Sequence, residues 1–568
     1  MTIPLVPLPQ RCELTAAGLT LGPRLRVGVP SGDLLGLAET VAGLLTRLHG
    51  LAATAEVTGP RAEAADLLLR IGPVAAGAAA ARGLDPWGRD DKADERYELR
   101  VGPNGGPNVG TNGCTNGGPN VGTDGGPNGG PNVGTDGGPN GGTVTAGSAD
   151  GLFRGATTFA QLIRQDRTVP GVHVVDGPAL RWRGLSLDVV RRFFPVAQVK
   201  RVIDLLALYK FNVLHLHLTD SQAWRLEIAG RPELTDERNW PNGDATRNGD
   251  GPQFYSAGDY RELVAYAAAR FVTVVPEIDM PGHAQAAIRA RPELAGTDEP
   301  AHPLLRYLDP RAGAAHDFAA DVLGRLAELT PGAYLHVGGD EAFGMPHDLY
   351  AAFVARALEL GRATGKRVVA WQESARSGAL TSRDVAQCWV GDGDAFDADR
   401  ARASAPAEHH PLIDIVAESF ARTPEDAPAA VAAGAWVLAS PSRVLYLDRR
   451  YAEDSTLDGQ TARRTQVGMP HYTPRTTREL FGWRPGELAE IPEGARLAGV
   501  EAAIWCESVT GFDDLAFLLL PRLPGIAEKA WTPQATEWDD YRDRLGAHAG
   551  WWERLGWGGF YRSKELFS

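Results

Sequence analysis

Two patterns of apolar and polar positions divide the chain into two regions. In the first region, apolar residues recur at helical spacing over Leu34–Leu48, and Tyr97–Val101 alternates as a half-buried strand does. From about Arg181 onward, short apolar runs alternate with amphipathic stretches, which is typical of parallel β/α units. We therefore predict a smaller N-terminal α/β domain, with a mixed sheet plus helices, over 1–177 and a larger domain over 178–568.

The larger domain contains eight candidate strands separated by helical patterns and long connections. Eight such units predict a (β/α)8 barrel of the TIM type with enlarged loops, and a doubly wound open sheet is the alternative. The candidate strands are Gly184–Asp188, Val213–His217, Val272–Ile278, Tyr334–Gly338, Arg367–Trp371, Val385–Trp389, Trp436–Ala439 and Leu497–Trp505.

Two segments match neither pattern. Residues 102–143 are rich in Gly, Asn and Pro and contain three copies of a twelve-residue unit with about one apolar residue per copy. That is too little to build a repeat core, and the cost of closing a loop grows slowly with its length. We therefore expect an expanded, exposed hairpin loop. Residues 392–418 look like a loop excursion after the sixth candidate strand. We assign neither segment a function.

Composition excludes some classes of partner and cofactor. The 568 residues carry a net charge of −14, which argues against binding to nucleic acid or to an anionic membrane. Four scattered cysteines indicate neither a zinc site nor a disulfide framework, and we expect no metal and no other cofactor. The start of the chain as given shows no leader and no membrane-spanning run. We therefore expect a cytoplasmic protein, or a secreted one if a leader was trimmed.

Polar residues gather where the candidate barrel strands end, which is where such barrels build their active sites. The fourth strand leads into HVGGDE, so that Asp340 and Glu341 stand side by side after two glycines. Adjacent acids are poor core material, because a buried charge is costly unless it is paired. Tryptophans also stand at strand ends. Their flat faces can stack on a sugar ring while acids bind its hydroxyls, and the combination favours a sugar site over a solvated acidic loop.

Five motifs, in this order along the chain, resemble those of glycoside hydrolase family 20, the β-N-acetylhexosaminidases. They are LHLHLTD at 214–220, PEIDMPGH at 276–283, HVGGDE at 336–341, YLD at 446–448 and WCE at 505–507. The resemblance covers nearly the whole chain. It implies an exo-acting, retaining enzyme that removes terminal non-reducing β-linked GlcNAc or GalNAc from a small oligosaccharide or glycoconjugate.

The resemblance also implies a mechanism in which the substrate supplies the nucleophile. Adjacent acids are awkwardly placed to flank a glycosidic bond from opposite faces, as the usual pair of carboxylates does. In the implied mechanism, Glu341 protonates the leaving group and later activates water. Asp340 orients the 2-acetamido group and stabilises an oxazolinium-type intermediate, and Tyr446 hydrogen-bonds the attacking acetamido oxygen.

Other positions take their implied roles from the same resemblance. Asp220 and His283 look like a buried pair that supports the acid/base glutamate, with Asp279 beside them. Arg191 resembles an arginine that binds the O3 and O4 hydroxyls, and Glu507 its partner at O4 and O6. The remaining implied contacts are Asp448 at O6 and a pocket wall of Trp371, Trp389 and Trp505.

Several polar residues have a structural interpretation instead. His215, His217 and His336 alternate with apolar residues and are expected in the barrel interior. Asp188 is expected to brace Arg191, and Glu277 is expected to be a structural group.

Other functions stay open from the sequence. A metal-dependent isomerase or aldolase could use His215, His217, Asp220, Asp279 and His283 as ligands. A sugar-binding protein without turnover, or an enzyme specialised for disaccharides or 6-substituted sugars, is a further alternative. The natural substrate, the preference between GlcNAc and GalNAc, and the oligomeric state are not predicted.

Overall fold

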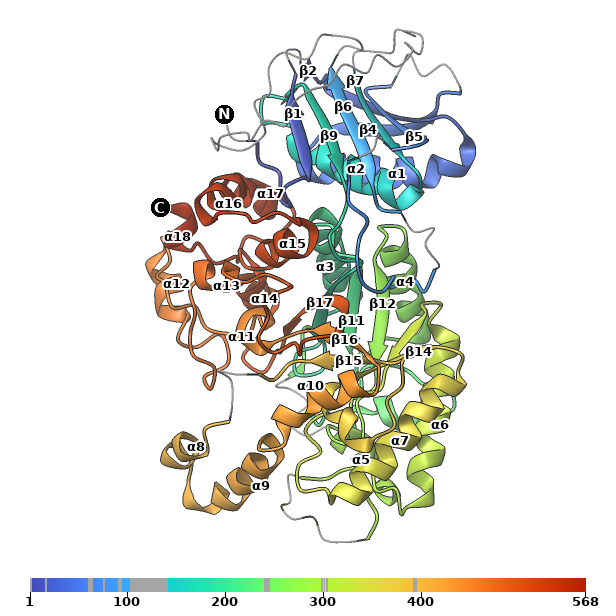
Figure 1. Cartoon of the computed structure of the whole chain (residues 1–568), viewed down its shortest axis with the longest axis vertical. Helices are drawn as coiled ribbons and strands as arrows, with labels where there is room; N and C mark the ends of the chain where they lie inside the picture. The colour runs from blue at the N-terminus through green and yellow to red at the C-terminus, as the bar shows by residue number, and fades with distance from the viewer. Residues whose placement is uncertain are drawn as a thin grey trace.

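The computed structural model describes residues 3–15, 18–59, 65–74, 77–89, 94–102, 141–239, 246–297, 300, 302, 305–391 and 396–568. They form two domains (Figure 1). Most of the repeat segment lies outside the described residues, so its conformation stays a prediction. The strands on either side of it pair antiparallel, with Gly102 opposite Gly141.

The N-terminal domain is a seven-stranded mixed sheet in the order β1-β9-β6-β7-β5-β3-β4. Its strands are β1 (Arg11–Leu14), β3 (Arg24–Val29), β4 (Ala52–Val57), β5 (Leu67–Ile71), β6 (Tyr97–Gly102), β7 (Gly141–Ala146) and β9 (Val172–Asp176), and β2 (Leu19–Thr20) pairs with β8 (Thr168–Val169). Helices α1 (Leu35–His49) and α2 (Ala149–Leu162) lie between this sheet and the second domain (Figure 1).

The second domain is a closed barrel of eight parallel strands, which confirms the predicted (β/α)8 fold and excludes the open sheet. The last strand pairs with the first, with Ala502 opposite Leu185. The strands are β10 (Trp182–Asp188), β11 (Val213–His217), β12 (Thr273–Glu277), β13 (Tyr334–His336), β14 (Arg367–Trp371), β15 (Val385–Cys388), β16 (Trp436–Ala439) and β17 (Arg496–Ile504).

Helices surround the barrel and extend its loops (Figure 1). They are α3 (Val196–Leu208), α4 (Ala257–Ala268), α5 (Gln285–Ala290), α6 (Gly313–Leu329), α7 (His347–Ala363), α8 (Ala398–Ser404), α9 (His410–Phe420), α10 (Thr423–Ala432), α11 (Ser442–Leu445), α12 (Asp458–Arg463), α13 (Thr477–Phe481), α14 (Phe512–Leu519), α15 (Leu523–Trp531), α16 (Trp538–Leu545), α17 (Ala549–Arg554) and α18 (Lys564–Phe567). The excursion after the sixth barrel strand, expected as a loop, contains helices α8 and α9 in its described part.

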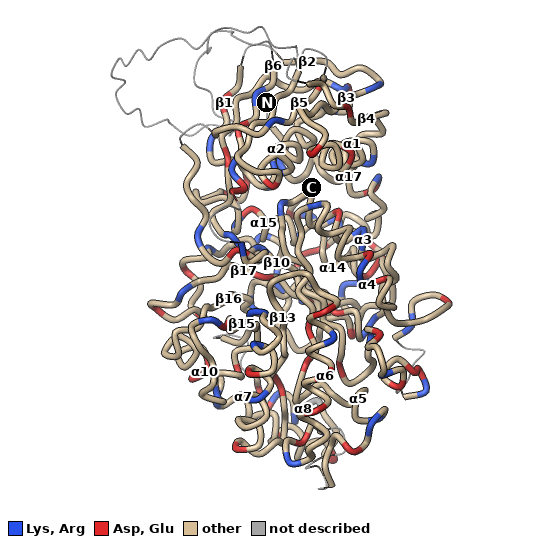
Figure 2. Tube along the Cα trace, turned by 90° about the vertical axis from the view of Figure 1, so that its right-hand side faces the viewer, with Lys and Arg blue, Asp and Glu red and all other residues tan. Residues whose placement is uncertain are grey.

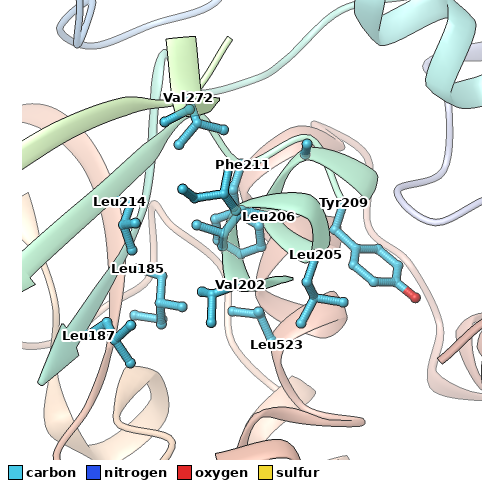
Figure 3. Packing of buried hydrophobic residues seen from close by; sticks show 14 of the residues in the cluster. Leu185, Leu187, Val202, Leu205, Leu206, Tyr209, Phe211, Leu214, Val272 and Leu523 are labelled. Atoms are coloured by element: carbon cyan, nitrogen blue, oxygen red, sulfur yellow. The ribbon is translucent and has the colours of Figure 1, made fainter. Parts of the chain in front are cut away.

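Amphipathic spacing explains how these helices attach to the barrel. On α3, Val202 and Leu206 are fully buried one turn apart, as expected for the apolar stripe of a surface helix. Figure 3 shows them beside Leu185 of β10 and Leu214 of β11, with Leu523 on the other side. Full burial of each such side chain contributes roughly 1.5–3 kcal/mol, so this packing holds the strand ends in place.

Charge and cysteine placement complete the description. Lys and Arg are interspersed with Asp and Glu along the described part of both domains (Figure 2). Within the described residues, no helix is long and apolar enough to span a bilayer. Cys388 and Cys506 are free and buried, whereas Cys12 is disulfide-bonded. The scattered spacing of the cysteines, which indicated no disulfide framework, did not predict this bond.

Candidate active site

A cavity of about 230 Å³ lies at the carboxyl ends of the barrel strands. Ten of the twelve site residues predicted from the sequence line it: Arg191, Asp220, His283, Asp340, Glu341, Trp389, Tyr446, Asp448, Trp505 and Glu507. The other two, Trp371 and Asp279, are buried just behind the lining. Strand ends that are far apart in the sequence therefore converge on one site.

The loop that carries the two adjacent acids has an unusual backbone. Strand β13 ends at His336, two residues earlier than predicted, because Gly338 and Gly339 adopt φ angles of 72° and 108°. A Cβ on Gly338 would lie 1.7 Å from Oδ1 of Asp279, so a side chain there is excluded by crowding as well as by conformation. Glu341 itself has φ 46°, a strained conformation of the kind found at functional sites.

A chain of hydrogen-bonding groups leads to Glu341 from behind. Its Oε2 lies 3.3 Å from Nε2 of His283, whose Nδ1 lies 3.1 Å from Oδ1 of Asp220. Although burial opposes the charge, the carboxylates of Asp220 and Asp340 raise the pKa of His283 well above its ordinary value. His283 is therefore an imidazolium near neutral pH and presents an N–H to Glu341.

Asp340 is held close to a second buried carboxyl group. Its Oδ2 lies 3.8 Å from Nε2 of His283, and ligand atoms of Asp279, His283 and Asp340 lie within 4.8 Å of one another. Burial and the charge of Asp279 raise the pKa of Asp340 well above its ordinary value. Burial also raises the pKa of Asp279 to about 6. The pair therefore shares a proton readily, and positive charge next to Asp340 would favour full ionisation.

Another part of the cavity lining is polar and contains a cation. Arg191 lies 2.6 Å from Asp220 and 3.8 Å from Glu507. Asp188 accepts hydrogen bonds from the backbone N–H groups of Val190 and Arg191, so it braces this loop as predicted. A guanidinium flanked by carboxylates, with hydrogen-bonding capacity toward the cavity, is suited to bind vicinal hydroxyls.

Aromatic rings form a further part of the cavity wall. The rings of Trp389 and Tyr446 are parallel within 5° at a centroid distance of 6.1 Å. The ring centroid of Trp505 lies 6.1 Å from that of Tyr446 and 6.0 Å from that of Trp371. Flat faces in this arrangement suit the apolar face of a sugar ring and a small acyl group.

Three cavity-lining residues were missed by the sequence interpretation. Met469, His471 and Tyr472 line the site from the long segment between β16 and β17. No motif marks these three residues, and the adjacent aromatic residues His471 and Tyr472 are the one sequence signal that could have indicated them. His217 also lines the cavity, although it was expected only as a structural residue.

The histidines of the barrel interior are paired with acids. Nδ1 of His217 lies 2.6 Å from Glu277 and its Nε2 lies 2.9 Å from Asp220. Nδ1 of His215 lies 2.9 Å from Glu501. Against the effect of burial, Glu277 raises the pKa of His215 to about 9 and that of His217 to about 10. A metal ion would have to displace protons from both imidazolium groups, which weighs against the alternative of a metal-dependent enzyme.

Fold and site together define a class of enzyme. A barrel whose strand ends hold two adjacent carboxyl groups and an aromatic wall has the arrangement of a glycoside hydrolase. The model of "Glycosyl hydrolase family 20, catalytic domain" matches residues 180–534. The chain belongs to this family. It is an enzyme, a glycoside hydrolase acting as a β-N-acetylhexosaminidase.

Two relatives and one solved structure support this assignment. A β-N-acetylhexosaminidase of Cellulomonas fimi is 39% identical over 426 residues, which cover 73% of this chain and 77% of that protein. A β-hexosaminidase of Porphyromonas gingivalis is 31% identical over 444 residues, covering 71% of this chain and 50% of that protein. The structure of the Streptomyces plicatus N-acetyl-β-hexosaminidase has a TM-score of 0.74 at 31% identity and covers 100% of this chain and 97% of its own.

Proposed function

We propose that this enzyme is an exo-acting, retaining β-N-acetylhexosaminidase that removes terminal non-reducing β-linked GlcNAc or GalNAc by substrate-assisted catalysis. The observation that carries the proposal is that Glu341 and Asp340 both approach one atom, Nε2 of His283, at 3.3 and 3.8 Å. A retaining enzyme with its own nucleophile needs a second carboxylate across the bond from the acid. Two acids on the same side favour a nucleophile from the substrate.

In the first step, Glu341 gives its proton to the glycosidic oxygen as the bond from that oxygen to the anomeric carbon breaks. The acetamido oxygen attacks the anomeric carbon and forms an oxazolinium-type intermediate. A nucleophile already attached to the substrate has a large entropic advantage. The carboxylate of Asp340 accepts the acetamido N–H and stabilises the positive charge that develops there.

In the second step, water attacks the anomeric carbon and the bond to the acetamido oxygen breaks. Glu341, now a carboxylate, takes the proton of that water. The imidazolium of His283, 3.3 Å away, stabilises this carboxylate between the two steps. Two displacements at the same carbon leave the β configuration retained.

Substrate size and orientation are inferred from the volume and the polar lining of the cavity. Its volume of about 230 Å³ is below the roughly 300–1,000 Å³ of sites for drug-sized ligands, which favours one sugar unit. Arg191, Asp448 and Glu507 would bind the hydroxyls farthest from the scissile bond. Their position closes the non-reducing end and supports exo action.

The test compares p-nitrophenyl N-acetyl-β-D-glucosaminide with the matching β-glucoside. The wild type is expected to hydrolyse only the acetamido sugar. Asp340→Ala and Glu341→Gln should each lower kcat by about 10²–10⁴-fold. Asp321→Asn, a change in a part-buried ion pair outside the cavity lining, is the control. Equal activity on the plain glucoside would contradict the proposal, because that substrate has no acetamido group.

A further inference from the structure

A second cavity of about 340 Å³ adjoins the sugar site on the other side of the acid/base loop. Glu341 lines both cavities, and Gly339 and the loop residues 342–346 contribute to the lining of the second one. The rest of its lining comes from the start of α7, from the 3-10 helix η6 (Gln372–Ser377) and from α9 with the turn after it. The mechanism proposed above gives this cavity no role.

Glu373 of η6 lies between this second cavity and the aromatic wall of the sugar site. It lines the second cavity, and both its carboxyl oxygens lie 3.2 Å from the indole nitrogen of Trp389. The neighbouring Gln372 holds the main chain of the same tryptophan, because the Oε1 of Gln372 accepts a hydrogen bond from the backbone N–H of Trp389 at 2.8 Å. Thus η6 holds both the main chain and the ring of Trp389.

We propose that Glu373 is a specificity-determining positioning residue. By holding the ring of Trp389 against the sugar site, it sets the size of the acyl group that the enzyme accepts on the substrate nitrogen. This inference rests on the proposed function, in which the 2-acetamido group lies against Trp389 and Tyr446.

The hydrogen bond that the indole N–H of Trp389 donates to Glu373 is the directional contact that fixes the ring. The other ring contacts of Trp389, to Tyr446 at 6.1 Å and to Phe420 at 6.0 Å, are apolar and tolerate sliding. Burying an indole N–H without an acceptor is energetically unfavourable. Without Glu373, the ring would turn toward the second cavity to recover a partner, and the acyl pocket would enlarge.

The charge state of Glu373 indicates the right control. Burial and the charge of Asp426, opposed by Arg376, raise the pKa of Glu373 to about 8. Arg376 is already paired with Asp426 at 2.6 Å. The side chain is therefore a neutral acid near pH 7, and glutamine reproduces both its shape and its accepting oxygen. Glu373→Gln is accordingly the matched variant, and Glu373→Ala and Glu373→Leu remove the acceptor.

The experiment measures kcat/KM on p-nitrophenyl β-glucosaminides that carry N-acetyl, N-propanoyl or N-butanoyl groups. One added methylene in a closed apolar pocket is worth about tenfold or more. We therefore expect the wild type and Glu373→Gln to prefer N-acetyl over N-butanoyl strongly. Glu373→Ala should lower this preference by about tenfold, through better relative use of the longer acyl groups.

The ratio of the two substrates separates this role from a purely structural one. A general loss of folding or activity lowers both rates and leaves the ratio unchanged. If Glu373→Ala does not fold, as judged by its melting temperature, Glu373→Leu fills the volume without an acceptor and is measured in the same way. An unchanged ratio in a folded Ala or Leu variant would overturn the inference. A wild type that ignores the acetamido group would instead overturn the proposed function.

Discussion

At the scale of single residues, the site depends on carboxylates and imidazoles that set each other's charge. Asp220 contacts both His217 and His283, and His217 in turn contacts Glu277. Each carboxylate in this series is stabilised as an anion by a neighbouring imidazolium, and each imidazolium is stabilised as a cation by a neighbouring carboxylate. The result is a charged interior that ends at Glu341, the proton donor in the proposed mechanism.

One prediction at this scale concerns stability and pH. Because the folded pKa of His215 is raised to about 9, its contribution is fully present below the unfolded value near 6.5 and is lost as pH rises through about 9. A shift of this size corresponds to about 3 kcal/mol. We expect the free energy of unfolding of the wild type to fall between pH 7 and 10.

The variant His215→Gln should be less stable at pH 7 and should lose less stability than the wild type between pH 7 and 10, where His217 still titrates. His347→Gln, a change at an exposed position, serves as the control. Urea unfolding at several pH values gives the comparison. Parallel pH curves for the wild type and His215→Gln would show that His215 carries no such charge.

At the scale of elements, short backbone irregularities place the side chains that strands alone would not. Strand β13 ends early so that Gly338 and Gly339 can turn Asp340 and Glu341 into the cavity. The N–H of Gly339 donates to Oδ1 of Asp279 at 3.0 Å, which fixes the turn.

A glycine substitution tests this turn. A Cβ at Gly339, where φ is 108°, would lie 2.1 Å from Oγ of Ser374. Gly339→Ala should therefore destabilise the protein by about 1–3 kcal/mol and strongly reduce kcat. Gly365→Ala provides the control, because φ there is 84° but nothing lies within 4 Å of the added Cβ. Loss of kcat in both variants would mean that backbone strain anywhere in the barrel is sufficient.

At the scale of the whole molecule, the N-terminal domain supports the end of the barrel that lies opposite the site. Arg154 of α2 is fully buried, bonds Glu95 at 2.9 Å and also donates to the carbonyl oxygens of Phe211 and Phe271. Arg183 of β10 holds the same Glu95 at 2.6 Å. These contacts lie just before β11 and β12 begin, where barrel residues serve stability rather than catalysis.

Arg154→Ala should consequently lower the free energy of unfolding by about 3–5 kcal/mol, because it leaves Glu95 with one buried partner fewer. The KM of the folded variant should stay at the wild-type value. Arg325→Ala removes a part-exposed ion pair and should change stability by less than about 1 kcal/mol. A raised KM without loss of stability would contradict a supporting role for this interface.

The sequence predicted the barrel and most of the site because both follow local rules. Apolar runs mark the strands, and residues that follow a strand, such as Asp340 and Glu507, must lie at the carboxyl end of the barrel. Tyr472 could not be placed in this way, since its position depends on the path of a long connection. Nor could the contact between Glu373 and Trp389, because it joins two different strand ends through side-chain packing.

The central claim is that the acetamido oxygen of the substrate is the nucleophile. The most direct measurement is kcat/KM across p-nitrophenyl β-glucosaminides with N-acetyl, N-fluoroacetyl, N-difluoroacetyl and N-trifluoroacetyl groups. Each fluorine withdraws electrons from that oxygen and hardly changes its size. Our account predicts a steep, regular fall in kcat/KM along the series. A flat series would contradict it and would require a nucleophile from the protein.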